Sequence, residues 1–201
     1  MPLLSHYNTL SLVEAGVDEA GRGPLAGDVY AAAVILPPNY DNPLLNDSKQ
    51  LTAKQRQQLR TEIERDALSW AVGIATVEEI DRYNILRATY MAMHRALDAL
   101  TTRPGFIIID GNRFAPYKDL PFATIVKGDG KYQNIAAASI LAKTHRDEYM
   151  AEQHQRYPLY GWDHNAGYGT REHREAIRQH GLTPLHRHSF NLLGDGQLSL
   201  F

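Results

Sequence analysis

The chain carries the stretch Val17-Asp18-Glu19-Ala20-Gly21-Arg22-Gly23-Pro24 near its N-terminus. The apolar residues before it predict a β-strand over residues 13–18 that ends in two adjacent carboxylates. The Gly-Arg-Gly-Pro segment neither continues a strand nor begins a helix cleanly, so the backbone is expected to turn there. Two acids beside a glycine loop with an arginine indicate a cation site next to an anion site. An ordinary charged surface turn is the alternative that these residues alone leave open.

Composition limits the class of protein. The chain has 201 residues, of which 43% are hydrophobic and 22% charged, and these values are typical of one globular domain. The formal net charge is −2, so a nucleic-acid-binding protein of this composition needs a local basic surface. Absence of cysteine excludes disulfides and thiolate metal sites. The N-terminus resembles no export signal and no apolar run reaches about 20 residues, so we expect a cytoplasmic protein with no membrane partner. A monomer is expected as well.

Alternating strand and helix patterns predict a mixed α/β domain with one sheet covered by helices. The predicted strands cover residues 13–18, 29–36, 69–75, 106–110 and 123–126. The predicted helices cover residues 52–66, a short segment after Thr76, and then 84–100, 132–155 and 170–180.

Acidic residues follow three of the predicted strands. These are Asp18 with Glu19, Asp110, and Asp129. If the three strands are parallel neighbours, their carboxyl ends bring the acids together, since α/β sheets place sites at that edge. Four carboxylates in one pocket require neutralisation, and an all-oxygen ligand set selects Mg²⁺ or Mn²⁺ over zinc. Two such ions suit phosphodiester hydrolysis, so the residues alone indicate a metal-dependent phosphoryl-transfer enzyme.

Five motifs, in this order and spacing, resemble those of bacterial ribonuclease HII. They are V-D-E-A-G-R-G-P at 17–24, N-D-S-K at 46–49, I-D-G at 109–111, V-K-G-D at 126–129 and A-A-A-S-I-L-A-K-T-H-R-D at 136–147. The resemblance covers roughly residues 13–190. It implies an RNase H-like fold, a five-stranded mixed sheet flanked by helices, with a helical C-terminal region. It also implies one catalytic domain over residues 1–190 and a flexible tail over 191–201.

The resemblance also implies an activity and a set of site residues. The expected enzyme cleaves RNA paired with DNA and nicks 5′ of single ribonucleotides in duplex DNA, giving 3′-hydroxyl and 5′-phosphate ends. The four acids match the family's catalytic metal ligands. Gly21, Arg22 and Gly23 match its loop that reads the ribose 2′-hydroxyl, and Tyr168 matches a tyrosine that stacks on the neighbouring deoxyribose. Phosphate contacts are expected from Lys49, Lys127, Lys143 and Arg146.

The sequence departs from the family pattern at one place, just before Gly167-Tyr168. Many relatives have a histidine and a basic residue just before the Gly-Tyr, where this chain has Asn165-Ala166 with His164 displaced by one. Two alternatives to a ribonuclease HII function stay open, which are another RNase H-like nuclease and a non-catalytic module that binds RNA–DNA hybrids.

The C-terminal third holds two further signals. Seven of the nine histidines lie there, together with Arg171, Arg174, Arg178 and Arg187, so a basic surface is expected in this region. His186 and His188 are weak evidence for a metal pair. The chain ends in a peptide that resembles the one by which bacterial repair proteins bind the DNA sliding clamp, with contacts expected from Gln197, Leu198, Leu200 and Phe201.

Overall fold

Five strands form a single mixed sheet in the order β3-β2-β1-β4-β5 in the computed structural model, which describes residues 3–9, 11–46 and 48–194. The strands are β1 (Glu14–Ala20), β2 (Val29–Ile35), β3 (Ser69–Ala75), β4 (Phe106–Asp110) and β5 (Phe122–Ile125). β1 pairs with β2 antiparallel and with β4 parallel, and β4 pairs with β5 parallel. The three strands that lead to the acids are therefore parallel neighbours, which meets the condition set in the sequence analysis.

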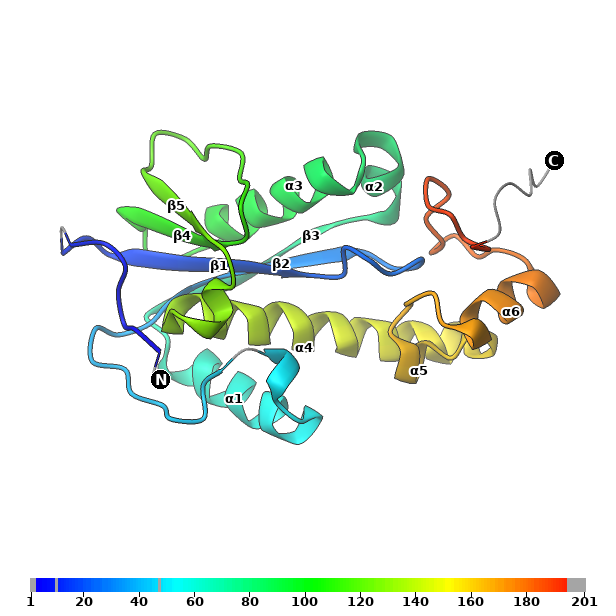
Figure 1. Cartoon of the computed structure of the whole chain (residues 1–201), viewed down its shortest axis with the longest axis horizontal. Coiled ribbons are helices and arrows are strands. Elements are labelled where there is room, and N and C mark those ends of the chain that lie inside the picture. Colours follow the sequence, from blue (N-terminus) through cyan, green and yellow to red (C-terminus); the bar gives the residue numbers. More distant parts are fainter. Residues whose placement is uncertain (1–2, 10, 47, 195–201) are drawn as a thin grey trace.

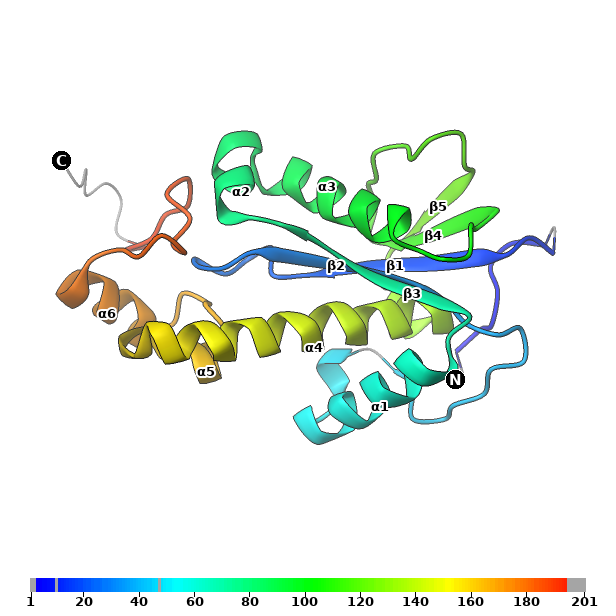
Figure 2. The ribbon, with the colours of Figure 1, turned by 180° about the vertical axis from the view of Figure 1, so that it is seen from behind.

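Helices cover both faces of the sheet (Figures 1 and 2). The helices are α1 (Ala53–Asp66), α2 (Val77–Tyr83), α3 (Ile85–Asp98), α4 (Gln133–Arg156), α5 (Trp162–Asn165) and α6 (Arg171–His180). Short 3₁₀ helices are η1 (Ser48–Gln50), η2 (Gly128–Gly130) and η3 (Pro158–Tyr160). Thr52 and Thr76 form capping boxes at the starts of α1 and α2, which confirms where the sequence placed these helix starts.

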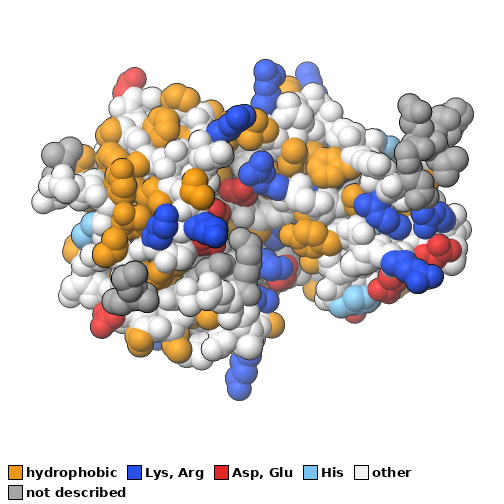
Figure 3. Space-filling view, in the orientation of Figure 1, with side chains coloured by type: hydrophobic (Ala, Val, Ile, Leu, Met, Phe, Trp, Pro, Cys, Tyr) orange, Lys and Arg blue, Asp and Glu red, His pale blue; other side chains and the backbone are white. Residues whose placement is uncertain are grey.

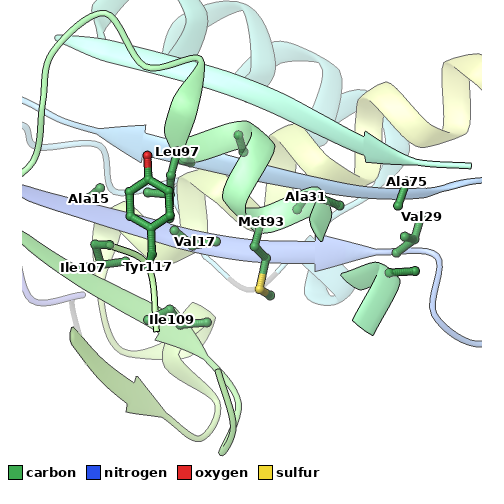
Figure 4. Packing of buried hydrophobic residues seen from close by; sticks show 14 of the residues in the cluster. Ala15, Val17, Val29, Ala31, Ala75, Met93, Leu97, Ile107, Ile109 and Tyr117 are labelled. Atoms are coloured by element: carbon green, nitrogen blue, oxygen red, sulfur yellow. The ribbon is translucent and has the colours of Figure 1, made fainter. Parts of the chain in front are cut away.

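One core lies between the sheet and α3 (Figure 4). Alternate residues of the central strands, such as Val17 and Ile109, meet Met93 and Leu97 of the helix there. A second core lies on the opposite face, where small residues of α4 pack on β2 and α1. Side chains at even positions of β1 and β4 therefore face α4.

α4 lies unusually close to β1. A Cβ built on Gly16 would come within 2.2 Å of the backbone carbon of Asn134, so only glycine allows this approach. The Asn134 side chain accepts a hydrogen bond from the Leu36 N–H at 2.9 Å and donates one to the Glu14 carbonyl at 3.2 Å. These contacts hold the start of α4 against two strands.

A third cluster packs the C-terminal segments against the turn between β1 and β2. It joins Leu25 and Ala26 to Trp162, Ile177 and the buried pair Leu192–Leu193. Leu192 and Leu193 thus pack on this cluster just beyond residue 190, where the division into a catalytic domain and a tail stays a prediction. No helix within the described residues is long and apolar enough to cross a membrane.

Candidate active site

Asp18 and Asp110 lie side by side at the carboxyl ends of neighbouring parallel strands. Val17 pairs in register with Ile109, and the two aspartates follow these residues on the face covered by α4. Asp18 is only 6% exposed. Burial, and then repulsion from Glu19 and Asp110, raise the pKa of the Asp18 carboxyl well above its usual value. The sheet thus brings Asp18 and Asp110, two of the four predicted acids, next to each other.

Asp129 reaches the same edge through η2. The N–H of Gly128 donates to Asp110 Oδ1 at 2.6 Å, which ties the start of η2 to the end of β4. Lys127, at φ 56°, provides the tight left-handed turn that precedes it. Asp129 itself is 5% exposed, so its carboxylate lies inside this edge of the protein.

Glu19 has a different environment. Successive side chains of a strand alternate between faces, so Glu19 leaves β1 on the side opposite Asp18. Arg22 forms an ion pair with Glu19 at 3.1 Å. Within the described residues, no group of three or more histidine, cysteine, aspartate or glutamate side chains is arranged to hold a metal ion. A metal site with all four carboxylates therefore stays a prediction.

The residues nevertheless fit a hard divalent cation chemically. The candidate ligands are all carboxylates, and a buried aspartate repelled by its neighbours gains from a nearby positive charge. Ser139 of α4 also donates a hydrogen bond to Asp18, and Ser48 lies 2.9 Å from Ser139. Both serines lie within quoted motifs, at 46–49 and 136–147, but the sequence analysis assigned them no role because nothing local shows that they meet.

The loop Gly21-Arg22-Gly23 directly follows these carboxylates. Gly21 has φ 96°, and a Cβ there would come within 2.1 Å of the Arg146 side chain, so glycine is required. Half of the Arg22 side chain is exposed. Figure 3 shows acidic side chains among lysines and arginines near the middle of one face of the molecule, so opposite charges gather there.

Comparisons with known proteins identify the family of the chain. The family model for ribonuclease HII matches residues 15–193. A ribonuclease HII of Bacteroides fragilis is 66% identical over 190 residues, which cover 94% of each chain. The chain belongs to the ribonuclease HII family.

Solved structures show the same fold. The ribonuclease H2 of Pyrococcus horikoshii superposes with a TM-score of 0.75 at 28% identity and covers 90% of this chain and 94% of its own. Bst-RNase HIII, solved in complex with Mn²⁺, gives a TM-score of 0.70 at 20% identity and covers 91% of this chain and 68% of its own. The predicted RNase H-like fold is confirmed, and as a ribonuclease HII the chain is an endoribonuclease of the ribonuclease H type.

Tyr168 lies near the glycine loop of this ribonuclease HII. Its ring is 3.6 Å from a Cβ built on Gly23, and the residue is 46% exposed. Beneath it, the ring of His173 lies 2.9 Å from the Tyr168 carbonyl and accepts a hydrogen bond from Trp162 Nε1. The backbone of Tyr168 is thus fixed beside the loop, and its ring is exposed there.

The expected phosphate-binding residues differ in their surroundings. Lys127 is exposed, whereas Lys143 pairs with Asp147 on its own helix. Lys49 lies in η1, and its side chain is outside the described part of the structure. Arg146 is 1% exposed and donates to the carbonyls of Ala26, Asp28 and Ala166. The expected phosphate contact is therefore wrong for Arg146, which stabilises the protein interior instead.

The predicted basic surface of the C-terminal third is wrong for three of its members, whereas Arg171, Arg178, His180 and His188 are exposed. His173, His186 and Arg187 are fully buried. Burial lowers the pKa of His173 and lowers that of His186 to about 4, so both rings are neutral at pH 7. Arg174 donates to the carbonyls of Asn191 and Leu192. In the sequence these histidines and arginines indicate a charged surface, whereas in the folded protein they form internal hydrogen bonds. The His186–His188 metal pair finds no support, because His186 bonds to Thr183.

Proposed function

We propose that this ribonuclease HII cuts the RNA strand of RNA–DNA hybrids and nicks duplex DNA 5′ of a single ribonucleotide, leaving 3′-hydroxyl and 5′-phosphate ends. The observation that carries the proposal is that buried Asp18 and partly buried Asp110 adjoin each other at the strand end from which the Gly21–Gly23 loop departs. Acids that suit phosphodiester chemistry thus adjoin a loop that suits close approach to a ribose.

Asp18, Glu19, Asp110 and Asp129 would hold Mg²⁺ or Mn²⁺. Two divalent ions, when bound, supply water activation and stabilise the leaving oxygen. The protein contributes the fixed strand ends and the Ser139 hydrogen bond that orients Asp18. Glu19 is proposed to leave its ion pair with Arg22 when it binds a metal ion. The Arg22 side chain is half exposed, so it can then turn towards the nucleic acid.

Selection of the ribonucleotide is assigned to the glycine loop and Tyr168. The 2′-hydroxyl is the group that separates RNA from DNA at a given site. A loop without side chains at Gly21 and Gly23 allows backbone groups to reach that hydroxyl. The exposed Tyr168 ring lies next to Gly23, where stacking on the neighbouring sugar is sterically open.

Further expectations from the sequence stay predictions. Lys49, Lys127 and Lys143 are proposed to contact phosphates, with Lys143 leaving Asp147 to do so. The clamp-binding peptide, Gln197 to Phe201, lies outside the described residues. The expected cytoplasmic location and monomeric state are likewise predictions.

A duplex with one ribonucleotide, incubated with Mg²⁺ or Mn²⁺ and compared with an all-DNA duplex, tests the proposal. The expected result is one nick 5′ of the ribonucleotide and no cut in all-DNA. Asp110→Asn should reduce cleavage at least about a hundredfold while binding of the duplex is kept.

Asp98→Asn is the matched control. Asp98 ends α3, near the start of β4, whereas Asp110 ends β4, so the two residues lie at opposite ends of the sheet. The control should cut like the wild type. Cutting of all-DNA by the wild type would favour a general RNase H-like nuclease. Binding without any cutting would favour a non-catalytic hybrid-binding module.

A further inference from the structure

Arg187 lies directly beneath the glycine loop although about 160 residues separate them in the sequence. The segment after α6 returns to the turn between β1 and β2 (Figure 1). The Arg187 side chain is fully buried there. Its guanidinium donates to the carbonyls of Gly21 at 2.6 Å, Arg22 at 3.1 Å and Pro24 at 2.8 Å, and twice to that of Gly27 at 2.6 and 2.9 Å.

These bonds determine which way the loop's N–H groups point. In a trans peptide the C=O and the following N–H point in opposite directions, and this chain contains no cis peptide among its described residues. Because the Gly21 and Arg22 carbonyls point inward to Arg187, the N–H groups of Arg22 and Gly23 point outward. No described group accepts a hydrogen bond from either N–H. By contrast, the N–H groups of Leu25 and Gly27 are bonded to Gly167 and Leu185.

The guanidinium is suited by shape as well as charge to bind several carbonyls at once. Its planar fork carries five N–H donors at fixed angles, whereas a lysine ammonium is a compact point charge. Burial lowers the pKa of Arg187 to about 9, so the group is still charged at pH 7. A buried positive charge costs stability unless its donors are satisfied, and the loop carbonyls satisfy them.

We propose that Arg187 is the positioning residue of the ribonucleotide-selecting loop: it pulls the loop carbonyls inward and thereby presents the N–H groups of Arg22 and Gly23 to the oxygen atoms of the ribose. The role of the loop in reading the 2′-hydroxyl rests on the proposed function. The orientation of the loop by Arg187 is a separate claim, which can be tested without catalysis.

The test compares Arg187→Lys with the wild type in two measurements. The first is kcat and KM on a duplex with one ribonucleotide, together with binding to an all-DNA duplex. We expect kcat to fall at least tenfold, with all-DNA binding within twofold of wild type. The second is amide hydrogen exchange over residues 21–28 without nucleic acid, where exchange at Leu25 and Gly27 should speed up at least tenfold. Arg95→Lys, which removes a guanidinium bonded to the Ile74 carbonyl elsewhere, is the matched control and should change neither.

Asp81→Ala provides a second variant if Arg187→Lys does not fold. Asp81 of α2 accepts hydrogen bonds from the backbone N–H groups of His188 and Ser189, so it holds the Arg187 segment from a partly exposed position. Its loss should speed exchange at Leu25 and Gly27 and lower kcat at least threefold. Unchanged exchange and kcat in the folded variants would overturn the role of Arg187 and leave the proposed function intact. A wild type that cuts no ribonucleotide would overturn the function, and exchange would still decide the role of Arg187.

Discussion

His173 Nε2 lies 3.2 Å from His186 Nε2 inside the C-terminal cluster. The Thr183 N–H donates to His186 Nδ1, so in the neutral ring the proton of His186 lies on Nε2 and points at His173. His173 Nε2 accepts this hydrogen bond and one from Trp162, which leaves its Nδ1–H to donate to the Tyr168 carbonyl. The chain of bonds requires both rings to be neutral.

The free energy of unfolding is therefore expected to fall as the pH drops from about 6.5 to 4. The pKa of His186 is about 4 in the folded protein, below the ordinary 6.5. Protons thus bind the unfolded chain more tightly in this window and destabilise the fold by about 3 kcal/mol at most. Denaturation of the wild type and His186→Gln at several pH values checks this. A variant with the same pH slope as the wild type would assign the loss to other groups.

Mn²⁺ is expected to stabilise the protein through the four carboxylates. A ligand at a free concentration of about 100 times its Kd adds about 2.7 kcal/mol to the free energy of unfolding. This corresponds to a rise of about 5 °C or more in the thermal midpoint. In Asp18→Asn this rise should largely disappear. With chelator present the same variant should be more stable than the wild type, because it removes a buried carboxyl whose charged form is unfavourable. Asp98→Asn should retain the full Mn²⁺ effect, and an equal rise in Asp18→Asn would argue against Asp18 as a ligand.

Gly16→Ala is expected to cost about 3 kcal/mol of stability. The new methyl would overlap backbone atoms of Asn134 and Ile135 at 2.2 and 2.4 Å, so α4 must move off β1. Gly130→Ala is the control, since nothing lies within 4 Å of a Cβ there. Urea denaturation of both variants compares the costs. Equal midpoints in the two would mean that α4 moves away from the sheet at little cost.

Removal of residues 197–201 is expected to abolish binding to the sliding clamp and leave cleavage of short duplexes unchanged. The reason is that three large apolar side chains close the chain, Leu198, Leu200 and Phe201, and suit insertion into an apolar pocket of a partner. Clamp pull-down with the full chain, the truncated chain and a Ser199→Ala control checks this. Undiminished clamp capture by the truncated chain would assign the contact to another surface.

Local sequence signals predicted most of the secondary structure. β3 and β4 have the predicted bounds, and the capping boxes of Thr52 and Thr76 mark helix starts at the expected residues. These features depend on neighbours within a few positions, so the sequence contains them directly. The sequence could not show whether β1, β4 and β5 are parallel neighbours, and their acids were expected to meet only if they are. The sheet has this parallel arrangement, which places Asp18 beside Asp110.

What the sequence determined by itself is the chemistry available: carboxylates at strand ends, a glycine loop beside them, and no cysteine. What only the tertiary structure decided is which charged groups face solvent. Arg146, His186 and Arg187 resemble a basic surface in the sequence, yet they are buried and bonded to the loop and its surroundings. The physical reason is that a buried cation is stabilised by carbonyls brought to it from distant parts of the chain, and no local pattern records where those carbonyls will lie.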